Sequence, residues 1–67
     1  MMSKELSFMI YCIEEYRARK EITGKEVMTI FKSFNVFQYL KDYYECLHTM
    51  GIEYIIQDID FYIHSKK

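Results

Sequence analysis

Residues 22–34, ITGKEVMTIFKSF, decide the fold, because they contain the clearest helix start in the chain. Thr23 followed three residues later by Glu26 is a capping box, in which each side chain accepts a hydrogen bond from the other residue's backbone N–H. The apolar residues behind this start recur at helical spacing, which predicts a largely buried amphipathic helix over 24–34. They are Val27, Met28, Ile30, Phe31 and Phe34.

A first helix is predicted upstream, over residues 3–20. Ser3 is a suitable N-cap, and Glu5 places a negative charge in the first turn, where it suits the helix dipole. The basic residues at the other end suit a helix C-terminus. The expected inward stripe is Leu6, Met9, Ile10, Ile13 and Tyr16, with Phe8 and Cys12 widening it.

A third helix is predicted over residues 36–49, after an interruption at Asn35. Asn35 has two interpretations: it ends the second helix in the left-handed conformation, or it caps the third helix with Gln38 at the matching position. Gly51 ends the third helix. Its expected inward stripe is Val36, Leu40, Tyr43, Tyr44 and Leu47, with Phe37 beside it.

The last segment, residues 52–64, is ambiguous. Its isoleucines fit helical spacing, but no good N-cap precedes Ile52, and an isoleucine-rich run also suits a strand. We favour a fourth helix over 52–64, and the alternative is an extended stretch over 53–56 followed by a short helix. The sequence therefore predicts an all-α fold, a small bundle of three to four helices forming a single domain over residues 1–67.

Composition limits the classes of function. The 67 residues include nine basic and ten acidic ones, for a net charge of −1, so no whole-protein field attracts a polyanion. Seven Tyr and five Phe supply many large side chains for a small core, and they leave some aromatic surface for a partner. A core of this size is marginal on its own, which favours a partner protein or a homo-oligomer.

We expect a cytoplasmic protein with no membrane segment. The N-terminus lacks the basic start and apolar run of a signal peptide, and the longest apolar run, residues 8–13, is far shorter than a membrane span. Cys12 and Cys46 lack CxxC spacing, so both are expected to be reduced and to act as small core hydrophobes.

No residue pattern indicates catalysis, a metal or a cofactor, and we expect a protein that is not an enzyme. His48 fits a helix C-terminus better than a general base. Asp58 and Asp60 do not face each other on a helix, so they are expected to be solvated or capping carboxylates, with Asp60 near His64. The histidines and cysteines lack the closely spaced pairs of a structural zinc site.

Two sets of residues are candidates for binding. A basic cluster surrounds the loop after the first helix and offers phosphate contacts, which would suit a helix-turn-helix that reads nucleic acid with the third helix. That helix carries Asp42 and Glu45, however, and lacks a basic face, so a solvated helix end is the simpler interpretation. The cluster is Arg17, Arg19, Lys20 and Lys25.

The second set consists of tyrosines, a residue type enriched at protein interfaces. The simpler interpretation is that they fill a small core. As candidates for partner binding we single out Tyr11, Tyr39, Tyr43 and Tyr54.

Three features taken together resemble a known family: TGKE at 23–26, FNVF at 34–37, and the stretch from HTMG at 48–51 to DID at 58–60. This small bacterial family is catalogued as domain of unknown function thirty-seven ninety-one, and the resemblance covers residues 4–63. It implies a short intracellular protein without assigned activity, often encoded beside proteins that resemble ADP-ribosyltransferases. It implies no catalytic residues.

These observations lead to a functional prediction. The chain is expected to be a small helical protein-interaction module, with an antitoxin or adaptor role toward an ADP-ribosyltransferase-like partner suggested by association alone. The alternative is a helix-turn-helix-like protein that binds nucleic acid or regulates its own expression.

Overall fold

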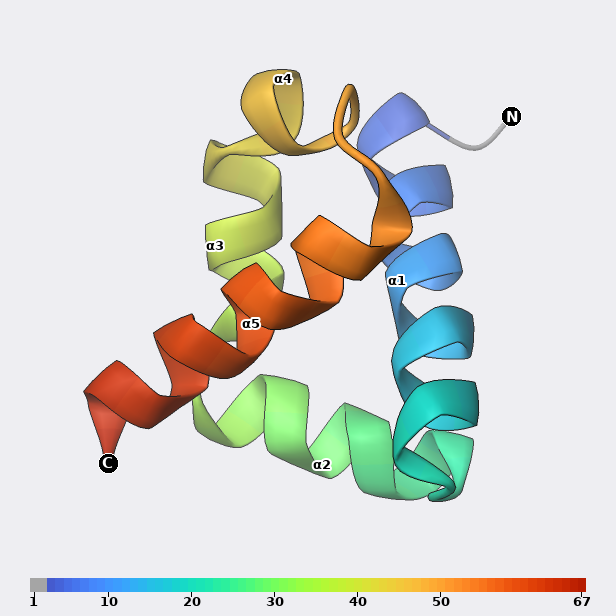
Figure 1. The fold of residues 1–67 in the computed structure, drawn as a ribbon, viewed down its shortest axis with the longest axis vertical. Helices are drawn as coiled ribbons and strands as arrows, with labels where there is room; N and C mark the ends of the chain where they lie inside the picture. The colour runs from blue at the N-terminus through green and yellow to red at the C-terminus, as the bar shows by residue number, and fades with distance from the viewer. Residues whose placement is uncertain (1–2) are drawn as a thin grey trace.

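Five helices make up the computed structural model, which describes residues 3–67. They are α1 (Lys4–Lys20), α2 (Gly24–Ser33), α3 (Val36–Asp42), α4 (Tyr44–Leu47) and α5 (Ile52–Lys66), and the described residues contain no strand. In Figure 1, α1, α2 and α3 follow three sides of the molecule, and α5 crosses diagonally in front of them. The prediction of a small all-α bundle is confirmed.

The predicted helix starts are present. The Ser3 hydroxyl oxygen accepts a hydrogen bond from the Leu6 backbone N–H at 3.0 Å, which caps α1. At the start of α2, the Thr23 side chain accepts from the Glu26 N–H and the Glu26 carboxylate accepts from the Thr23 N–H, both at 3.1 Å. Both halves of the capping box therefore form, as the sequence predicted.

Two non-glycine residues adopt the left-handed conformation, and each ends a helix. Glu21 has φ 54° after α1, and Asn35 has φ 58° after α2. Of the two interpretations of Asn35, the left-handed end of α2 is correct, because its side chain caps nothing in α3. Gln38 donates to the Asp42 carboxylate at 2.8 Å instead of taking part in a capping box.

The predicted third helix over 36–49 is wrong as a single element. The chain bends at Tyr43, whose φ of −109° and ψ of 19° separate α3 from the one-turn α4. In a straight helix Tyr43, Tyr44 and Leu47 would share one side. The bend instead turns Tyr43 into solvent, while Leu47 is buried and Tyr44 packs edge-on against Phe8 of α1, with ring centroids 5.5 Å apart.

The last segment is helical, so the favoured prediction is confirmed and the extended alternative over 53–56 is wrong. α5 also continues to Lys66, two residues beyond the predicted end. Its buried side is formed entirely by isoleucine, which brings α5 onto the shared core. These buried residues are Ile55, Ile56, Ile59 and Ile63.

The inward side of α1 matches the predicted stripe in part: Met9, Ile13 and Tyr16 contact the core, and Leu6 and Ile10 do not belong to it. Phe8, Cys12 and Tyr16 are buried, whereas Leu6 and Ile10 are 45% and 42% exposed. Because α1 is apolar around much of its circumference, helical spacing alone does not tell which of its apolar sides faces α2 and α5.

Phe31 of α2 lies at the centre of the core, fully buried. Its ring meets those of Tyr16 and Phe37 edge-on, with centroids 5.2 and 5.5 Å away. The radius of gyration, 11.1 Å, agrees with the value of about 11 Å expected for a compact domain of this length. The apolar supply is therefore enough to close a core around α2.

Candidate protein-interaction surface

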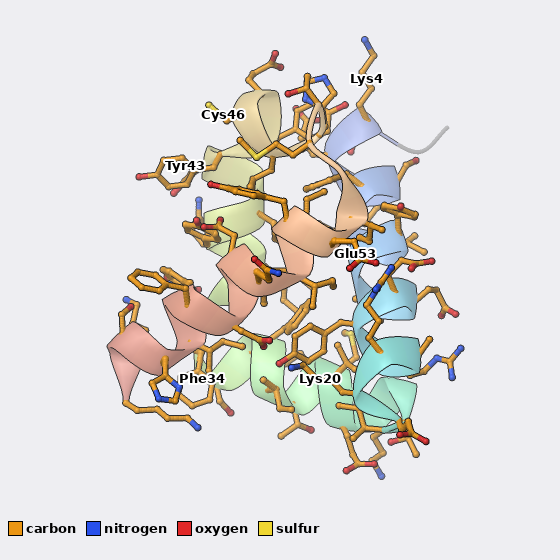
Figure 2. All side chains as sticks on the ribbon, in the orientation of Figure 1. Lys4, Lys20, Phe34, Tyr43, Cys46 and Glu53 are labelled. Carbon is orange, nitrogen blue, oxygen red and sulfur yellow. The ribbon has the colours of Figure 1, made fainter. Side chains whose placement is uncertain are left out.

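Aromatic side chains gather on one side of the molecule, where α3 meets α5. Tyr43, Tyr54 and Phe61 are 53%, 55% and 76% exposed. Tyr43 projects away from the bundle at the end of α3 (Figure 2), and its ring centroid lies 5.0 Å from that of Tyr39. Tyr39 donates a hydrogen bond to the Asp58 carboxylate of α5. We call these five residues the tyrosine face.

Tyr39 is the fixed member of the tyrosine face. Its ring stacks on that of Tyr62, with centroids 4.1 Å apart and planes 17° from parallel. Burial raises the pKa of the Tyr39 hydroxyl well above its usual value, and the hydrogen bond to Asp58 raises it further. Tyr39 therefore remains a hydrogen-bond donor at neutral pH.

A shallow hollow lies on the tyrosine face beside Asp58. It has a volume of about 200 Å³ and is lined by Tyr54, Gln57, Asp58 and Phe61. Three of the four tyrosines singled out from the sequence thus lie near one carboxylate. Tyr39 donates to Asp58, Tyr43 lies beside the Tyr39 ring, and Tyr54 lines the hollow that Asp58 borders.

The fourth tyrosine, Tyr11, is placed elsewhere. It is 44% exposed on α1, where Leu6 and Ile10 are also exposed. Within residues 3–67 its ring has no aromatic partner of the kind that joins Tyr39 to Tyr43. The structure therefore does not bring Tyr11 into the tyrosine face.

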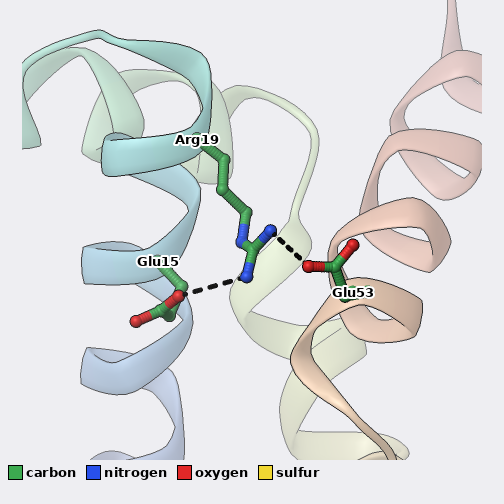
Figure 3. Close-up of polar contacts among 3 residues, drawn as sticks. All are labelled: Glu15, Arg19 and Glu53. Carbon is green, nitrogen blue, oxygen red and sulfur yellow. Dashed lines mark hydrogen bonds and ion pairs between the residues drawn. The ribbon is translucent and has the colours of Figure 1, made fainter.

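The basic cluster is largely paired with carboxylates. Arg19 bridges Glu15 at 3.6 Å and Glu53 of α5 at 2.9 Å (Figure 3). Arg17 pairs with Glu14 at 3.3 Å. Because these partners neutralise the guanidinium charges, the cluster presents less positive potential than its sequence suggests.

The remaining two cations of the cluster differ from each other. Lys20 forms an ion pair with Asp60 at 2.6 Å, and Figure 2 shows its side chain directed toward α5. Lys25 forms no ion pair with another described residue, and it lines a separate open depression on α2 of about 370 Å³. Only this one cation of the cluster is thus left for an outside anion.

Asp58 and Asp60 are not merely solvated, contrary to the sequence-based expectation. Asp58 accepts from Tyr39 of α3, and Asp60 accepts from Tyr16 of α1 at 3.0 Å as well as pairing with Lys20. A usable signal was present: on a helix, residues on either side of the buried Ile59 lie about 100° from it in opposite directions. Carboxylates at the two edges of a buried stripe face the neighbouring helices.

His48 occupies the helix end that was predicted for it. Its Nδ1 lies 2.7 Å from the Tyr44 carbonyl oxygen, and its ring stacks on the Tyr44 ring with centroids 4.4 Å apart. The prediction for the cysteines holds for Cys12, which is buried, and is wrong for Cys46, which α4 exposes to solvent. Burial raises the pKa of the Cys12 thiol to about 12.

Residues 3–67 contain no cluster of three or more His, Cys, Asp or Glu side chains able to hold a metal ion. None of the described helices combines the length and apolar character needed to cross a membrane.

A further open depression of about 470 Å³ lies on α5 next to Phe61. It is lined by Gln57, Asp60, Phe61, His64 and Ser65.

Comparison with known proteins places the chain in a family. The model of the family described as protein of unknown function (DUF3791) matches residues 7–66, almost the whole chain. The chain belongs to the DUF3791 family. Neither the curated proteins nor the solved structures gave a match to this DUF3791 chain. The resemblance seen in the sequence is thereby confirmed, and its description assigns no activity.

Proposed function

We propose that this DUF3791 chain is a protein-interaction module that acts by binding rather than by catalysis, and that it docks its partner on the tyrosine face. The observation that carries the proposal is the exposure of three large aromatic side chains, Tyr43, Tyr54 and Phe61, around the half-buried Asp58. Aromatic side chains provide much of the binding energy of protein interfaces, because they bury large areas at a small entropy cost.

The proposed occupant is another protein that presents apolar and basic side chains. Apolar contacts fit the exposed rings, and basic contacts fit the carboxylate of Asp58, which has no ion-pair partner among the described residues. The resemblance to a family encoded beside ADP-ribosyltransferase-like proteins suggests such a protein as the partner. In that case the chain serves as its antitoxin or adaptor.

Co-expression with an ADP-ribosyltransferase-like protein of the kind that the family resemblance suggests, followed by size-exclusion chromatography with light scattering, tests this proposal. The two proteins should elute together. The double variant Tyr54→Ala/Phe61→Ala should abolish co-elution while keeping its helical circular dichroism, because both side chains are mostly in solvent.

A control is available on α1. Leu6 and Ile10 are 45% and 42% exposed, less than Tyr54 and Phe61, so Leu6→Ala/Ile10→Ala removes a smaller exposed apolar area outside the tyrosine face and should leave co-elution intact. Separate elution of the two wild-type proteins contradicts the assigned partner. A chain that elutes as a dimer through the tyrosine face contradicts a hetero-complex and identifies a second copy as the occupant.

The alternative, binding to nucleic acid, has less support because Arg17, Arg19 and Lys20 already pair with carboxylates. It predicts binding to duplex DNA that weakens steeply as salt increases. A mobility-shift assay at low salt decides between the two functions, since the interaction module predicts no shift of DNA.

A further inference from the structure

α5 carries two aspartates that take part in the same kind of contact on its two flanks. Asp60 accepts a hydrogen bond from the Tyr16 hydroxyl of α1, and Asp58 accepts one from the Tyr39 hydroxyl of α3. In both pairs the tyrosine hydroxyl is the donor and a carboxylate oxygen is the acceptor. The two sites therefore begin from the same chemistry.

At Asp60 the chain supplies a cation. One carboxylate oxygen, Oδ1, receives the Tyr16 hydroxyl, and the other, Oδ2, receives the Lys20 ammonium at 2.6 Å. The same ammonium lies 5.5 Å from the centre of the Tyr16 ring, in cation–π range. A carboxylate and an aromatic ring thus hold one basic side chain between them.

At Asp58 the corresponding cation is absent from the described residues. Its Oδ2 receives the Tyr39 hydroxyl, and neither a hydrogen bond nor an ion pair within residues 3–67 engages Oδ1. The carboxylate borders the hollow of about 200 Å³, whose other walls are Tyr54, Gln57 and Phe61. Two exposed aromatic side chains therefore line the same hollow as this carboxylate.

We infer that the hollow at Asp58 binds a basic side chain of a partner protein, and that this side chain completes the arrangement that Lys20 completes at Asp60. An arginine suits the hollow best, because its planar guanidinium both pairs with a carboxylate and stacks on aromatic rings. This inference rests on the proposed function, and it adds the chemistry by which the tyrosine face selects a partner.

Titration of the isotope-labelled chain with N-acetyl-arginine methylamide, followed by 1H–15N NMR, tests the inference without a partner. Amide shifts should concentrate on residues 54–61 and saturate in the millimolar range. The matched probe N-acetyl-citrulline methylamide has nearly the same shape without the charge, and it should give no saturable shift. Equal shifts with both probes, or arginine shifts scattered over the surface, overturn the inference.

Variants assign the binding to the carboxylate. Asp58→Asn retains an oxygen that accepts from Tyr39 but removes the charge, so arginine binding should weaken about tenfold or more. Asp42→Asn is the control, because Asp42 is an exposed aspartate of α3 that accepts a hydrogen bond from Gln38, and binding should be unchanged. Unchanged binding in Asp58→Asn contradicts the inference.

Removal of Lys20 tests the comparison between the two aspartates. In Lys20→Ala the Asp60 carboxylate loses its cation, and it already borders an open depression beside Phe61. A second set of saturable arginine shifts should then appear around Asp60. If the shift pattern of Lys20→Ala equals that of the wild type, the comparison on which the inference stands is wrong.

The outcomes separate this inference from the proposed function. Co-elution with the neighbouring protein without arginine binding contradicts the basic side chain and leaves the interaction module intact. Arginine binding without co-elution contradicts the assigned partner and leaves the hollow as a cation site.

Discussion

Replacement of Glu21 by glycine should stabilise this protein. Glu21 ends α1 with φ 54° and ψ 47°, a conformation that costs an ordinary L-residue about 1–2 kcal/mol. Glycine adopts it without that cost but loses about 0.5–1 kcal/mol through its greater freedom in the unfolded chain. The expected net gain in the free energy of unfolding is therefore about 0.5–1 kcal/mol.

Removal of the Glu21 side chain should not itself lower the free energy of unfolding. It is exposed, and it forms neither a hydrogen bond nor an ion pair with another described residue. Its contribution to the helix end is made by the backbone, since the N–H groups of Glu21 and Ile22 both donate to the Arg17 carbonyl. Glycine keeps both of these bonds.

Thermal and urea unfolding followed by circular dichroism at 222 nm measure the effect. With an unfolding entropy of about 2.1 cal/mol/K per residue, the gain corresponds to a rise in Tm of about 4–7 °C. The urea m-value should not change, because the buried surface is the same.

Two control variants isolate the backbone effect. Glu21→Ala removes the negative charge from the helix C-terminus but keeps the left-handed strain, so it should gain clearly less than glycine. Ala18→Gly changes an exposed residue in the last turn of α1 and should lose up to about 1 kcal/mol. The reasoning is refuted if Glu21→Gly lowers Tm, or if Glu21→Ala raises it by as much as glycine does.

Three further predictions concern other contacts. Thr23→Ala removes the hydroxyl that caps α2 and should reduce the free energy of unfolding by about 1 kcal/mol in urea titrations, and an unchanged midpoint would show that the capping box contributes nothing. With Ellman's reagent, Cys46 should react at once in the folded chain and Cys12 only after unfolding, since burial raises the pKa of Cys12 to about 12. Rapid reaction of both thiols in the folded chain would contradict the buried position of Cys12. Burial, and then the hydrogen bond to Asp60, raises the Tyr16 pKa from 10.0 to about 12, so the unfolded state loses this proton first and the free energy of unfolding should fall as pH rises from 10.0 to 12. Tyr16→Phe should make that fall less steep, and an identical slope would contradict the assignment.

The sequence predicts the parts of this fold that depend on local signals. Both helix starts with good caps, at Ser3 and Thr23, are correct because a capping interaction involves residues only three positions apart. The bend at Tyr43 was missed because no glycine or proline marks it in the sequence, and the contact that Tyr44 makes beyond it is with Phe8, which is far away in the chain. Leu6 and Ile10 were wrongly placed on the inward side of α1 because the side that meets the other helices is also set by tertiary contacts.

The candidate surface was predicted in part. Three of the tyrosines selected from the sequence, Tyr39, Tyr43 and Tyr54, lie together on one side of the molecule, and their role in binding stays a prediction. Phe61, the most exposed large hydrophobic side chain among the described residues, was missed because an aromatic residue in an isoleucine-rich segment suggests core. The partners of Asp58 and Asp60 were missed because they come from α3 and α1, and spacing within α5 does not reveal them.

The two tyrosine–aspartate contacts also determine the register of α5. Its buried side consists of isoleucines, which are interchangeable, so apolar packing alone tolerates a rotation about the helix axis or a shift by one turn. The hydroxyls of Tyr16 and Tyr39 meet α5 from opposite flanks, and both find a carboxylate in only one orientation. The isoleucines thus stabilise the packing of α5 on the core, whereas the two aspartates select one orientation of α5. Variants that lack both carboxylates should remain helical and compact while their NMR spectra lose the dispersion of a single native state.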